Sequence, residues 1–251
     1  MIIIRAANQC GKADYGWLQA RYTFSFGHYF DPKFLNYRAL RVLNQEVLAP
    51  KAEFQPKSYP HVDVLNIILQ GEVQYRDSEG NNFHARQGDC LLFSARQGIR
   101  YSEHNTSDKM PLTRLQLWLN ACPQQETQPL QRKVLPNKPL TLLASPTSES
   151  NSMHLRQQVW ISYLTLKPHN SQILVLRGKH AYLQSISGNA VISGNSVMND
   201  NTVTNGSTRT NSDKSREIKI KCGDGVFIQG EQKVILQADT SFKGLFIDLD
   251  D

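Results

Sequence analysis

Four cysteines are the residues of this chain that could most directly do redox or metal chemistry. Cys10, Cys90, Cys122 and Cys222 are widely spaced and form no C-x-x-C pair. In a chain without an export signal, such spacing argues against both a disulfide framework and a zinc ribbon. We therefore expect four reduced thiols, most of them packed in the interior.

Cys122 is the strongest candidate for a redox-sensitive thiol. It follows an alternating apolar strand expected over residues 112–120 and precedes a proline. Strand ends are more exposed than strand middles, and an exposed thiol that can ionise is open to oxidation. Cys10, in a polar turn, is the second candidate. Cys90 and Cys222 stand at strand entries, so we expect both to be packed.

No catalytic motif for hydrolysis or nucleotide binding accompanies these thiols. The chain contains no G-x-S-x-G, no phosphate-binding P-loop and no H-E-x-x-H sequence. His28 is expected to be structural. His154, His169 and His180 are scattered, without an H-x-H pair or a carboxylate partner, so the second half of the chain offers no metal motif.

Charge and composition indicate a globular protein with no preference for nucleic acid. Of 251 residues, 39% are hydrophobic and 20% charged, and the net charge is +6. Residues 1–125 carry 14 basic and 11 acidic side chains, as do the remaining residues, so there is no basic block of the kind that binds nucleic acid. No run approaches the ~18 apolar residues of a membrane span. The first residues do not resemble a signal peptide. We expect a cytoplasmic monomer.

The elements that must position these residues are short strands. Apolar runs separated by turn signals recur about every 8–12 residues, which is typical of a sandwich or barrel. A strand, a glycine turn, a hairpin and then Gly-Asp before another apolar strand occur around residues 68–93 and again around 185–228. This repeat predicts two copies of one β-barrel.

The repeat also suggests the domain boundaries. We expect an N-terminal domain over residues 1–120 and a proline-rich polar linker over 121–148 that holds one short element over residues 140–144. A C-terminal domain should follow over 149–251. Its second hairpin is swollen by a polar stretch over 194–215, which cannot bury enough apolar surface to offset its ordering entropy, so we expect a mobile loop there.

Several segments resemble the pirin family. Residues 24–32, 40–44 and 68–81 are similar to its signatures, and Gly98, Tyr101 and Asn105 fall on the glycine, histidine and asparagine of the second cupin motif, G-x-x-H-x-x-x-N. The resemblance is dense over about residues 15–120. It implies an all-β bicupin, with two antiparallel, jelly-roll-like cupin barrels in tandem.

The resemblance also raises the question of a metal. Pirins and their quercetinase-active relatives hold one Fe-type divalent ion in the N-terminal barrel with three histidines and one glutamate. Carried over position by position, the histidines fall on Lys57, Tyr59 and Tyr101, and only Glu103 is kept. An ammonium group and neutral phenols are poor ligands, so we expect no metal and no other cofactor. We predict instead that Lys57 pairs with Glu103 as a fixed cation.

A rearranged site is the alternative. His61 and Asp63 lie close to the family positions in sequence and could form a weak site together with Glu103. His104 follows Glu103 directly, but neighbouring strand residues point to opposite faces, so His104 should face away if Glu103 faces inward.

Three functions remain open. The favoured one is a pirin-like protein without metal chemistry that is redox-responsive, ligand-binding or regulatory, with a small polar molecule or a regulatory protein as its partner. The second is a quercetin 2,3-dioxygenase-like oxygenase with a weak or rearranged metal site. The third is a regulator that acts through the transcription machinery, as the resemblance to eukaryotic pirin suggests.

Overall fold

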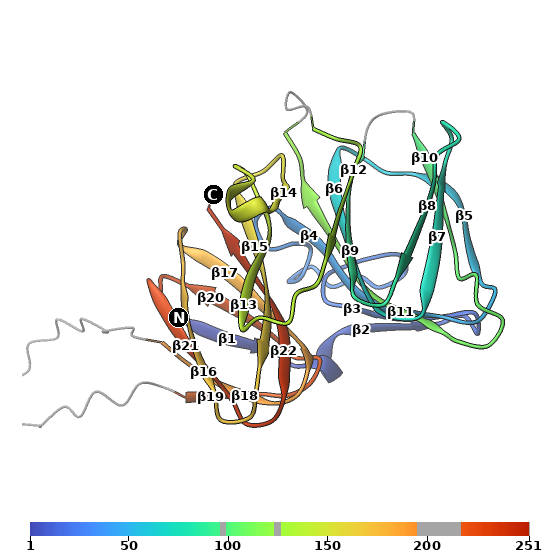
Figure 1. Cartoon of the computed structure of the whole chain (residues 1–251). Helices are drawn as coiled ribbons and strands as arrows, with labels where there is room; N and C mark the ends of the chain where they lie inside the picture. Colours follow the sequence, from blue (N-terminus) through green and yellow to red (C-terminus); the bar gives the residue numbers. More distant parts are fainter. Residues whose placement is uncertain (96–98, 123–126, 195–216, 251) are drawn as a thin grey trace, which may run out of the picture.

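The chain folds into two β-barrels packed side by side, which confirms the expected all-β bicupin (Figure 1). A computed structural model describes residues 1–95, 99–122, 127–194 and 217–250. Each barrel pairs a seven-stranded sheet with a four-stranded sheet. No helix among the described residues is long and apolar enough to cross a membrane.

The first barrel is built from the N-terminal half of the chain. Its seven-stranded sheet has the order β12-β9-β6-β11-β4-β3-β2, and its four-stranded sheet has the order β5-β10-β7-β8. The strands are β2 (Gly11–Asp14), β3 (Leu18–Tyr22), β4 (Leu40–Leu48), β5 (Glu53–Ser58), β6 (Val62–Gln70), β7 (Glu72–Asp77), β8 (Asn82–Arg86), β9 (Asp89–Ser94), β10 (Arg100–His104), β11 (Leu112–Asn120) and β12 (Leu130–Val134).

The second barrel repeats this plan. Its sheets have the orders β1-β20-β17-β22-β15-β13-β14 and β16-β21-β18-β19. The strands are β1 (Ile2–Arg5), β13 (Leu140–Ser145), β14 (Met153–His154), β15 (Val159–Leu166), β16 (Ser171–Val175), β17 (His180–Ser187), β18 (Ala190–Gly194), β19 (Glu217–Ile220), β20 (Gly225–Gln229), β21 (Lys233–Ala238) and β22 (Phe242–Leu249). Two short 3-10 helices, η1 (Ala7–Gln9) and η2 (Glu149–Asn151), lie outside the sheets.

Three apolar cores follow from this arrangement. One fills each barrel, and a third lies between the two seven-stranded sheets. In β11, Leu115, Leu117 and Leu119 belong to the core between the barrels. Because strand side chains alternate between faces, Arg114 and Trp118 point instead into the first barrel. Both faces of this sheet are therefore buried, and its polar face is the inside of a barrel.

The connection between the barrels is more ordered than the expected linker over 121–148. Its residues form β12, which pairs with β9 of the first barrel, and β13, which pairs with β15 of the second. Pro129, Pro136 and Pro139 flank these strands and do not interrupt them. This is where proline is compatible with a β-ladder. The expected mobile loop over 194–215 falls outside the described residues from position 195 onward.

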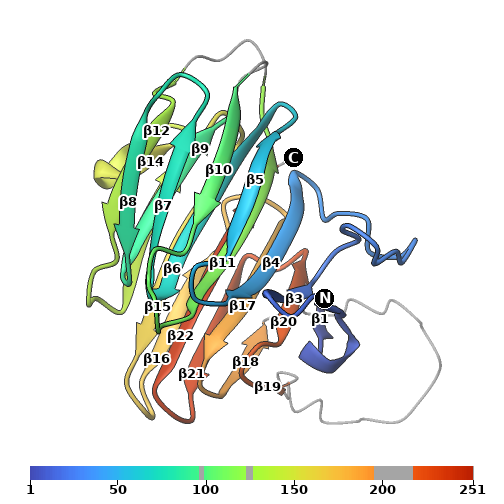
Figure 2. The same cartoon turned by 90° about the vertical axis from the view of Figure 1, so that its right-hand side faces the viewer.

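The first strand of the chain belongs to the second barrel. β1 pairs with β20 and so completes the second barrel, although it belongs to the segment expected to form the first domain. Figure 2 shows β1 beside β20, and the chain then runs through η1 into β2 of the first barrel. The N-terminal strand and the following loop thus hold the two barrels together.

Candidate functional site

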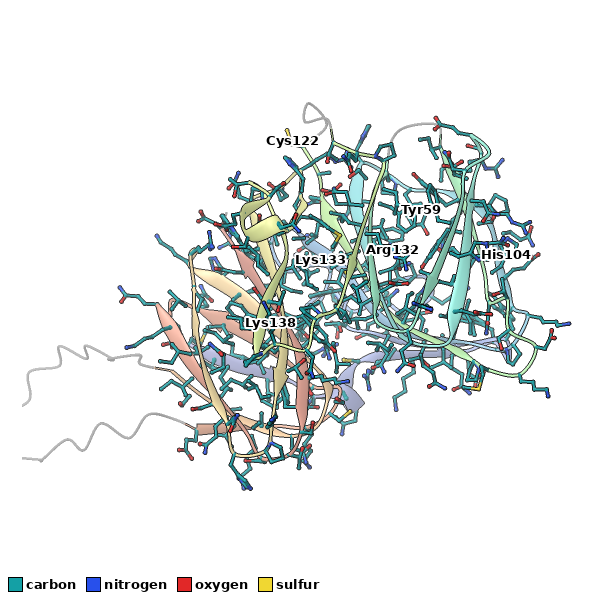
Figure 3. The ribbon with its side chains drawn as sticks, in the orientation of Figure 1. Tyr59, His104, Cys122, Arg132, Lys133 and Lys138 are labelled. Atoms are coloured by element: carbon teal, nitrogen blue, oxygen red, sulfur yellow. The ribbon has the colours of Figure 1, made fainter. Side chains whose placement is uncertain are left out.

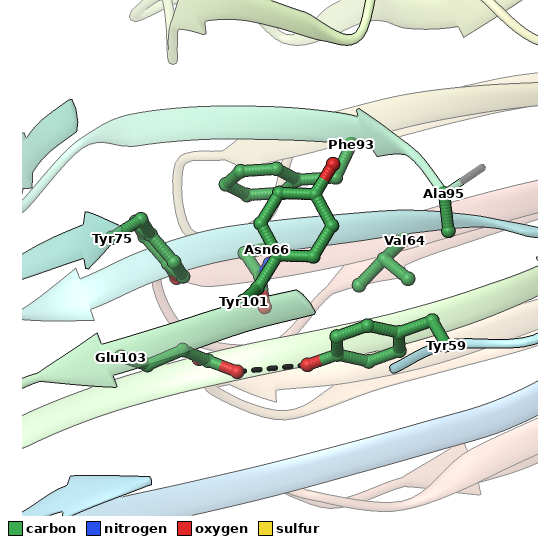
Figure 4. A pocket seen from close by; sticks show the side chains of 8 residues that line it. All are labelled: Tyr59, Val64, Asn66, Tyr75, Phe93, Ala95, Tyr101 and Glu103. Carbon is green, nitrogen blue, oxygen red and sulfur yellow. Dashed lines mark hydrogen bonds between the residues drawn. The ribbon is translucent and has the colours of Figure 1, made fainter. Parts of the chain in front are cut away.

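The structure brings the four family positions together inside the first barrel. Tyr101 and Glu103 lie on β10, and Lys57 lies on the neighbouring β5, with Tyr59 just beyond it. The Tyr59 hydroxyl donates a hydrogen bond of 2.9 Å to Oε1 of Glu103 (Figure 4). The Lys57 Nζ lies 3.9 Å from the same oxygen, so the predicted pair between Lys57 and Glu103 is present at the outer limit of ion-pair distance.

A closer cation for Glu103 is Arg114, which sequence reasoning missed. Arg114 on β11 is fully buried, and its guanidinium forms an ion pair with Glu103. Its Nε and Nη2 atoms donate to one carboxylate oxygen of Glu46 on β4, at 2.9 and 2.7 Å. Its Nη1 reaches the Tyr75 hydroxyl at 3.4 Å. One guanidinium therefore connects two buried carboxylates across the barrel.

The electrostatics of this cluster favour a permanent positive charge on Arg114. Burial is the largest single influence and opposes that charge, but the Glu46 carboxylate, its hydrogen bonds and the oxygens of Tyr75 and Tyr59 together outweigh burial and raise the pKa of Arg114 above its ordinary value. The pKa of Lys57 moves the other way. Burial of its ammonium and repulsion from Arg114 lower it to about 8, although Lys57 keeps 34% of its side-chain surface exposed and lies 4.3 Å from the Phe54 ring centroid.

The tyrosines of the cluster are neutral hydrogen-bonding groups. Tyr59 is buried, and burial raises the pKa of its phenol well above the ordinary value. The pKa of Tyr75 is raised for the same reason. The rings pack against one another, with 6.0 Å between the centroids of Tyr59 and Tyr101. A phenol that keeps its proton and donates it to a carboxylate has little to offer a metal ion.

Little space is left inside this barrel. The cavity beside the cluster has a volume of about 10 Å³. That corresponds to roughly one water molecule. Its lining residues, drawn in Figure 4, are Tyr59, Val64, Asn66, Tyr75, Phe93, Ala95, Tyr101 and Glu103.

The residues of the alternative metal site do not join the cluster. The His61 side chain is exposed. Asp63 is fully buried, but it faces the junction of the two barrels, where its two oxygens accept hydrogen bonds of 2.8 Å each from the backbone and Nε of Arg156. His104 lies at the outer edge of the barrel, as Figure 3 shows, and its Nδ1 lies 2.8 Å from Oε2 of Glu53.

The cysteines differ in accessibility. Cys90 is fully buried, and burial raises the pKa of its thiol. Cys10, the second redox candidate, is also buried, and burial likewise raises the pKa of its thiol. Cys222 is exposed, contrary to the expectation that it is packed, because it stands in the turn before β20 and not inside that strand.

Cys122 is partly exposed and lies close to the contact between the barrels (Figure 3). Its backbone N–H donates a hydrogen bond of 2.9 Å to the carbonyl of Arg156. The Arg156 side chain also donates to the carbonyls of Val62 and Ala95, at 3.0 and 3.2 Å. Cys122 is therefore attached to the polar contact that joins the second barrel to the first.

The residues inside the first barrel do not fit a divalent metal. In the part of the chain that the structure describes, no group of three or more His, Cys, Asp or Glu residues could hold an ion. Glu103 is the one carboxylate kept from the family ligands, and it already has Arg114 and Tyr59 as partners. A metal ion there would also meet the positive charge of Arg114.

Comparison with known proteins agrees with this architecture. The family model named Pirin matches residues 3–119. The chain is also 50% identical over 249 residues to the pirin-like protein YhaK of Escherichia coli K12, and this alignment covers 99% of each protein. This chain belongs to the pirin family. A second model, the quercetinase C-terminal cupin domain, matches residues 142–249 of this pirin-family chain.

The chain is also similar to two further proteins. This pirin-family chain is 29% identical over 255 residues to a protein of E. coli K12 named quercetin 2,3-dioxygenase, and this alignment covers 99% of each protein. It also superposes on the crystal structure of the bacterial pirin YhhW from E. coli in complex with nickel(II). That superposition has a TM-score of 0.87 at 27% identity and covers 100% of this chain and 99% of the other.

Proposed function

We propose that this pirin-family protein acts by binding or regulation and not as a metal-dependent dioxygenase. The observation that carries this proposal is the fully buried Arg114, paired with Glu46 and Glu103. Its guanidinium supplies within the barrel the positive charge that a divalent ion supplies in metal-binding pirins. Oxygen activation needs a metal or another redox centre, and the cluster of a guanidinium, an ammonium, two carboxylates and phenols provides neither.

The size of the cavity supports the same conclusion. A substrate of the size of a flavonol needs a pocket of several hundred Å³. The cavity in the first barrel has about 10 Å³. Binding such a substrate beside Glu103 would require the packed tyrosines to move apart.

Metal stoichiometry tests this proposal. We expect untagged, full-length protein from cells supplied with iron, nickel, copper, zinc and manganese to hold well below one equivalent of metal and to leave quercetin unchanged. A matched gain-of-binding variant combines Lys57→His, Tyr59→His and Tyr101→His with Arg114→Gln, which restores the family's histidine positions and removes the guanidinium. The proposal is supported if this variant binds nickel and the wild-type protein does not.

The contrary result is equally clear. About one equivalent of metal in the wild-type protein, lost on Glu103→Gln, would overturn the proposal and favour the oxygenase. Quercetin cleavage that depends on this metal would complete the case for the oxygenase.

A redox-responsive role is a second candidate, and the position of Cys122 favours it. Cys122 is partly exposed and hydrogen-bonded through its backbone to Arg156 at the contact between the barrels. Peroxide would oxidise its thiolate to a sulfenate with release of water, which adds a polar oxygen at this contact. We expect Cys122 to be alkylated in native protein much faster than the buried Cys90. Equal rates for Cys122 and Cys90 would remove this candidate.

A further inference from the structure

A second cleft, outside the first barrel, lies where the start of the chain meets the loop between β3 and β4. It is open to solvent and has a volume of about 340 Å³. That volume is at the lower end of the range for small-molecule sites, roughly 300–1,000 Å³. Its walls come from β1, from β20 and from the loop residues Lys33, Phe34, Asn36 and Tyr37, so both halves of the chain contribute.

Arg5, at the end of β1, lines this cleft and has an unusual environment. Its side chain is buried, with 5% of the residue exposed. The guanidinium lies 3.5 Å from the ring centroid of Phe34, and Nη2 donates to the Tyr29 hydroxyl at 3.0 Å. Nε has no hydrogen-bond partner within the described residues. Neither contact of the guanidinium supplies a negative charge.

The other buried arginines show what Arg5 lacks. Arg114 pairs with Glu46 and Glu103, and Arg156 pairs with Asp63. None of the ion pairs found among the described residues includes Arg5. A buried charge is costly unless an opposite charge or several hydrogen bonds compensate it.

The carboxylates close to β1 in the fold are already engaged. The two oxygens of Asp224 accept hydrogen bonds from the backbone N–H groups of Ala7 and Lys221, at 2.8 and 2.9 Å. Glu231 forms an ion pair of 2.9 Å with the terminal ammonium of Met1. Within the described residues, therefore, no carboxylate compensates the charge of Arg5, which leaves it open to an anion from outside.

The wall beside Arg5 is aromatic. Phe34 is stacked on Phe227, with 6.1 Å between ring centroids and 25° between planes. Tyr37 meets Phe227 edge-on at 4.9 Å. Lys33 is an exposed cation among the lining residues. Flat aromatic walls favour a flat apolar ligand, and two cations favour a negative one.

We propose that this cleft binds a small planar aromatic carboxylate, with the carboxylate compensating the charge of Arg5 and the ring packed against Phe34 and Phe227. Arginine suits this role because its planar guanidinium can bind a carboxylate while one face stacks on a ring. The site lies outside the first barrel and its Arg114 cluster. Its test is therefore independent of the metal test above.

Calorimetric titration of the full-length protein with 4-hydroxybenzoate at low ionic strength tests the proposal, with uncharged 4-hydroxybenzamide as the matched ligand. We expect saturable one-to-one binding of the acid and binding of the amide that is weaker by about tenfold or more, because a hydrogen-bonded ion pair is lost. Arg5→Gln should weaken binding of the acid by a similar factor. Arg177→Gln is the matched control, since Arg177 also lies over a ring, that of Trp160, but is paired with Glu149.

Two less buried positions keep the test decisive if Arg5→Gln does not fold. Lys33→Gln and Phe34→Leu should each weaken binding of the acid by several-fold. Unchanged affinity in both variants would overturn the proposal, as would equal affinity for the acid and the amide. Absence of saturable binding by the wild-type protein would also overturn it. If inorganic phosphate binds as tightly as the acid and competes with it, the aromatic part of the proposal is wrong.

Discussion

Arg114→Met should destabilise the first barrel severely, because it removes the charge that two buried carboxylates share. Methionine keeps much of the length of the arginine stem but has no charge and no donor. Glu46 has 3% of its surface exposed and Glu103 has 1%, so water cannot replace the lost guanidinium. Lys57, at 3.9 Å from Glu103, compensates only that carboxylate and only in part.

The magnitude follows from the contacts that are lost. Arg114 makes two hydrogen bonds of 2.9 and 2.7 Å to Glu46 and an ion pair with Glu103, with no exposed surface on its own side chain. Removing one partner of a buried ion pair costs about 3–5 kcal/mol. Against a total stability of about 5–15 kcal/mol for a domain, this loss is large.

Urea unfolding followed by tryptophan fluorescence measures this effect. Trp118 packs on Tyr59, with 5.0 Å between ring centroids, so it reports on the first barrel. Arg177→Met is the control, because its ion pair with Glu149 is partly exposed and is expected to contribute at most about 1 kcal/mol. Adding Glu46→Gln to Arg114→Met should recover more than about 1 kcal/mol, since one uncompensated buried charge disappears.

Two results would refute the reasoning. One is an unfolding midpoint for Arg114→Met that shifts no more than that of Arg177→Met. The other is a further loss of stability when Glu46→Gln is added to Arg114→Met. Either would mean that the guanidinium is not the counter-charge of these carboxylates.

Two further predictions concern the charged groups at the edge of the cluster and at the barrel junction. The acetylation rate of Lys57, measured by mass spectrometry at a series of pH values, should reach half its maximum near pH 8. The exposed Lys51 is the control, because Asp108 raises its pKa and its half-maximal rate should lie above pH 10.5. The same pH profile for both lysines would contradict the lowered pKa of Lys57. Because unfolded Lys57 keeps its proton up to its ordinary pKa of 10.5, the unfolded state binds more protons between about pH 8 and 10.5, so the contribution of Lys57 to stability rises with pH in that window. Arg156→Met leaves Asp63 buried and unpaired, so it should lower the free energy of unfolding by about 3–5 kcal/mol. In scanning calorimetry, the two barrels of this variant should unfold in separate transitions. A single transition at the wild-type temperature would contradict the role of Arg156.

Much of the fold was predictable from local patterns. The strand expected over residues 112–120 corresponds to β11, because apolar residues alternate there with a period of two. The two Gly-Asp turns marked the repeat. The segment over 121–148 was harder, because its prolines resemble those of a linker while the strands between them depend on partners elsewhere in the chain.

The candidate site was predictable only in part. The resemblance to the pirin family placed Lys57, Tyr59, Tyr101 and Glu103 together, because they lie on or directly after strands whose places the family pattern fixes. The same alternation that placed Leu115 in an apolar core also put Arg114 on the opposite face, and that was the available signal for Arg114. Arg114 was not considered from the sequence alone.

The strand pattern, the repeat, the family and the replacement of three histidines could be derived from the amino-acid sequence. The tertiary contacts were needed to show that the polar face of β11 is the interior of a barrel, that Asp63 pairs with Arg156, and that none of the described carboxylates pairs with Arg5. The physical reason is that alternation along a strand separates two faces but does not say what covers each of them. Here both faces are covered, and residues distant in the chain decide whether a buried charge has an opposite charge beside it.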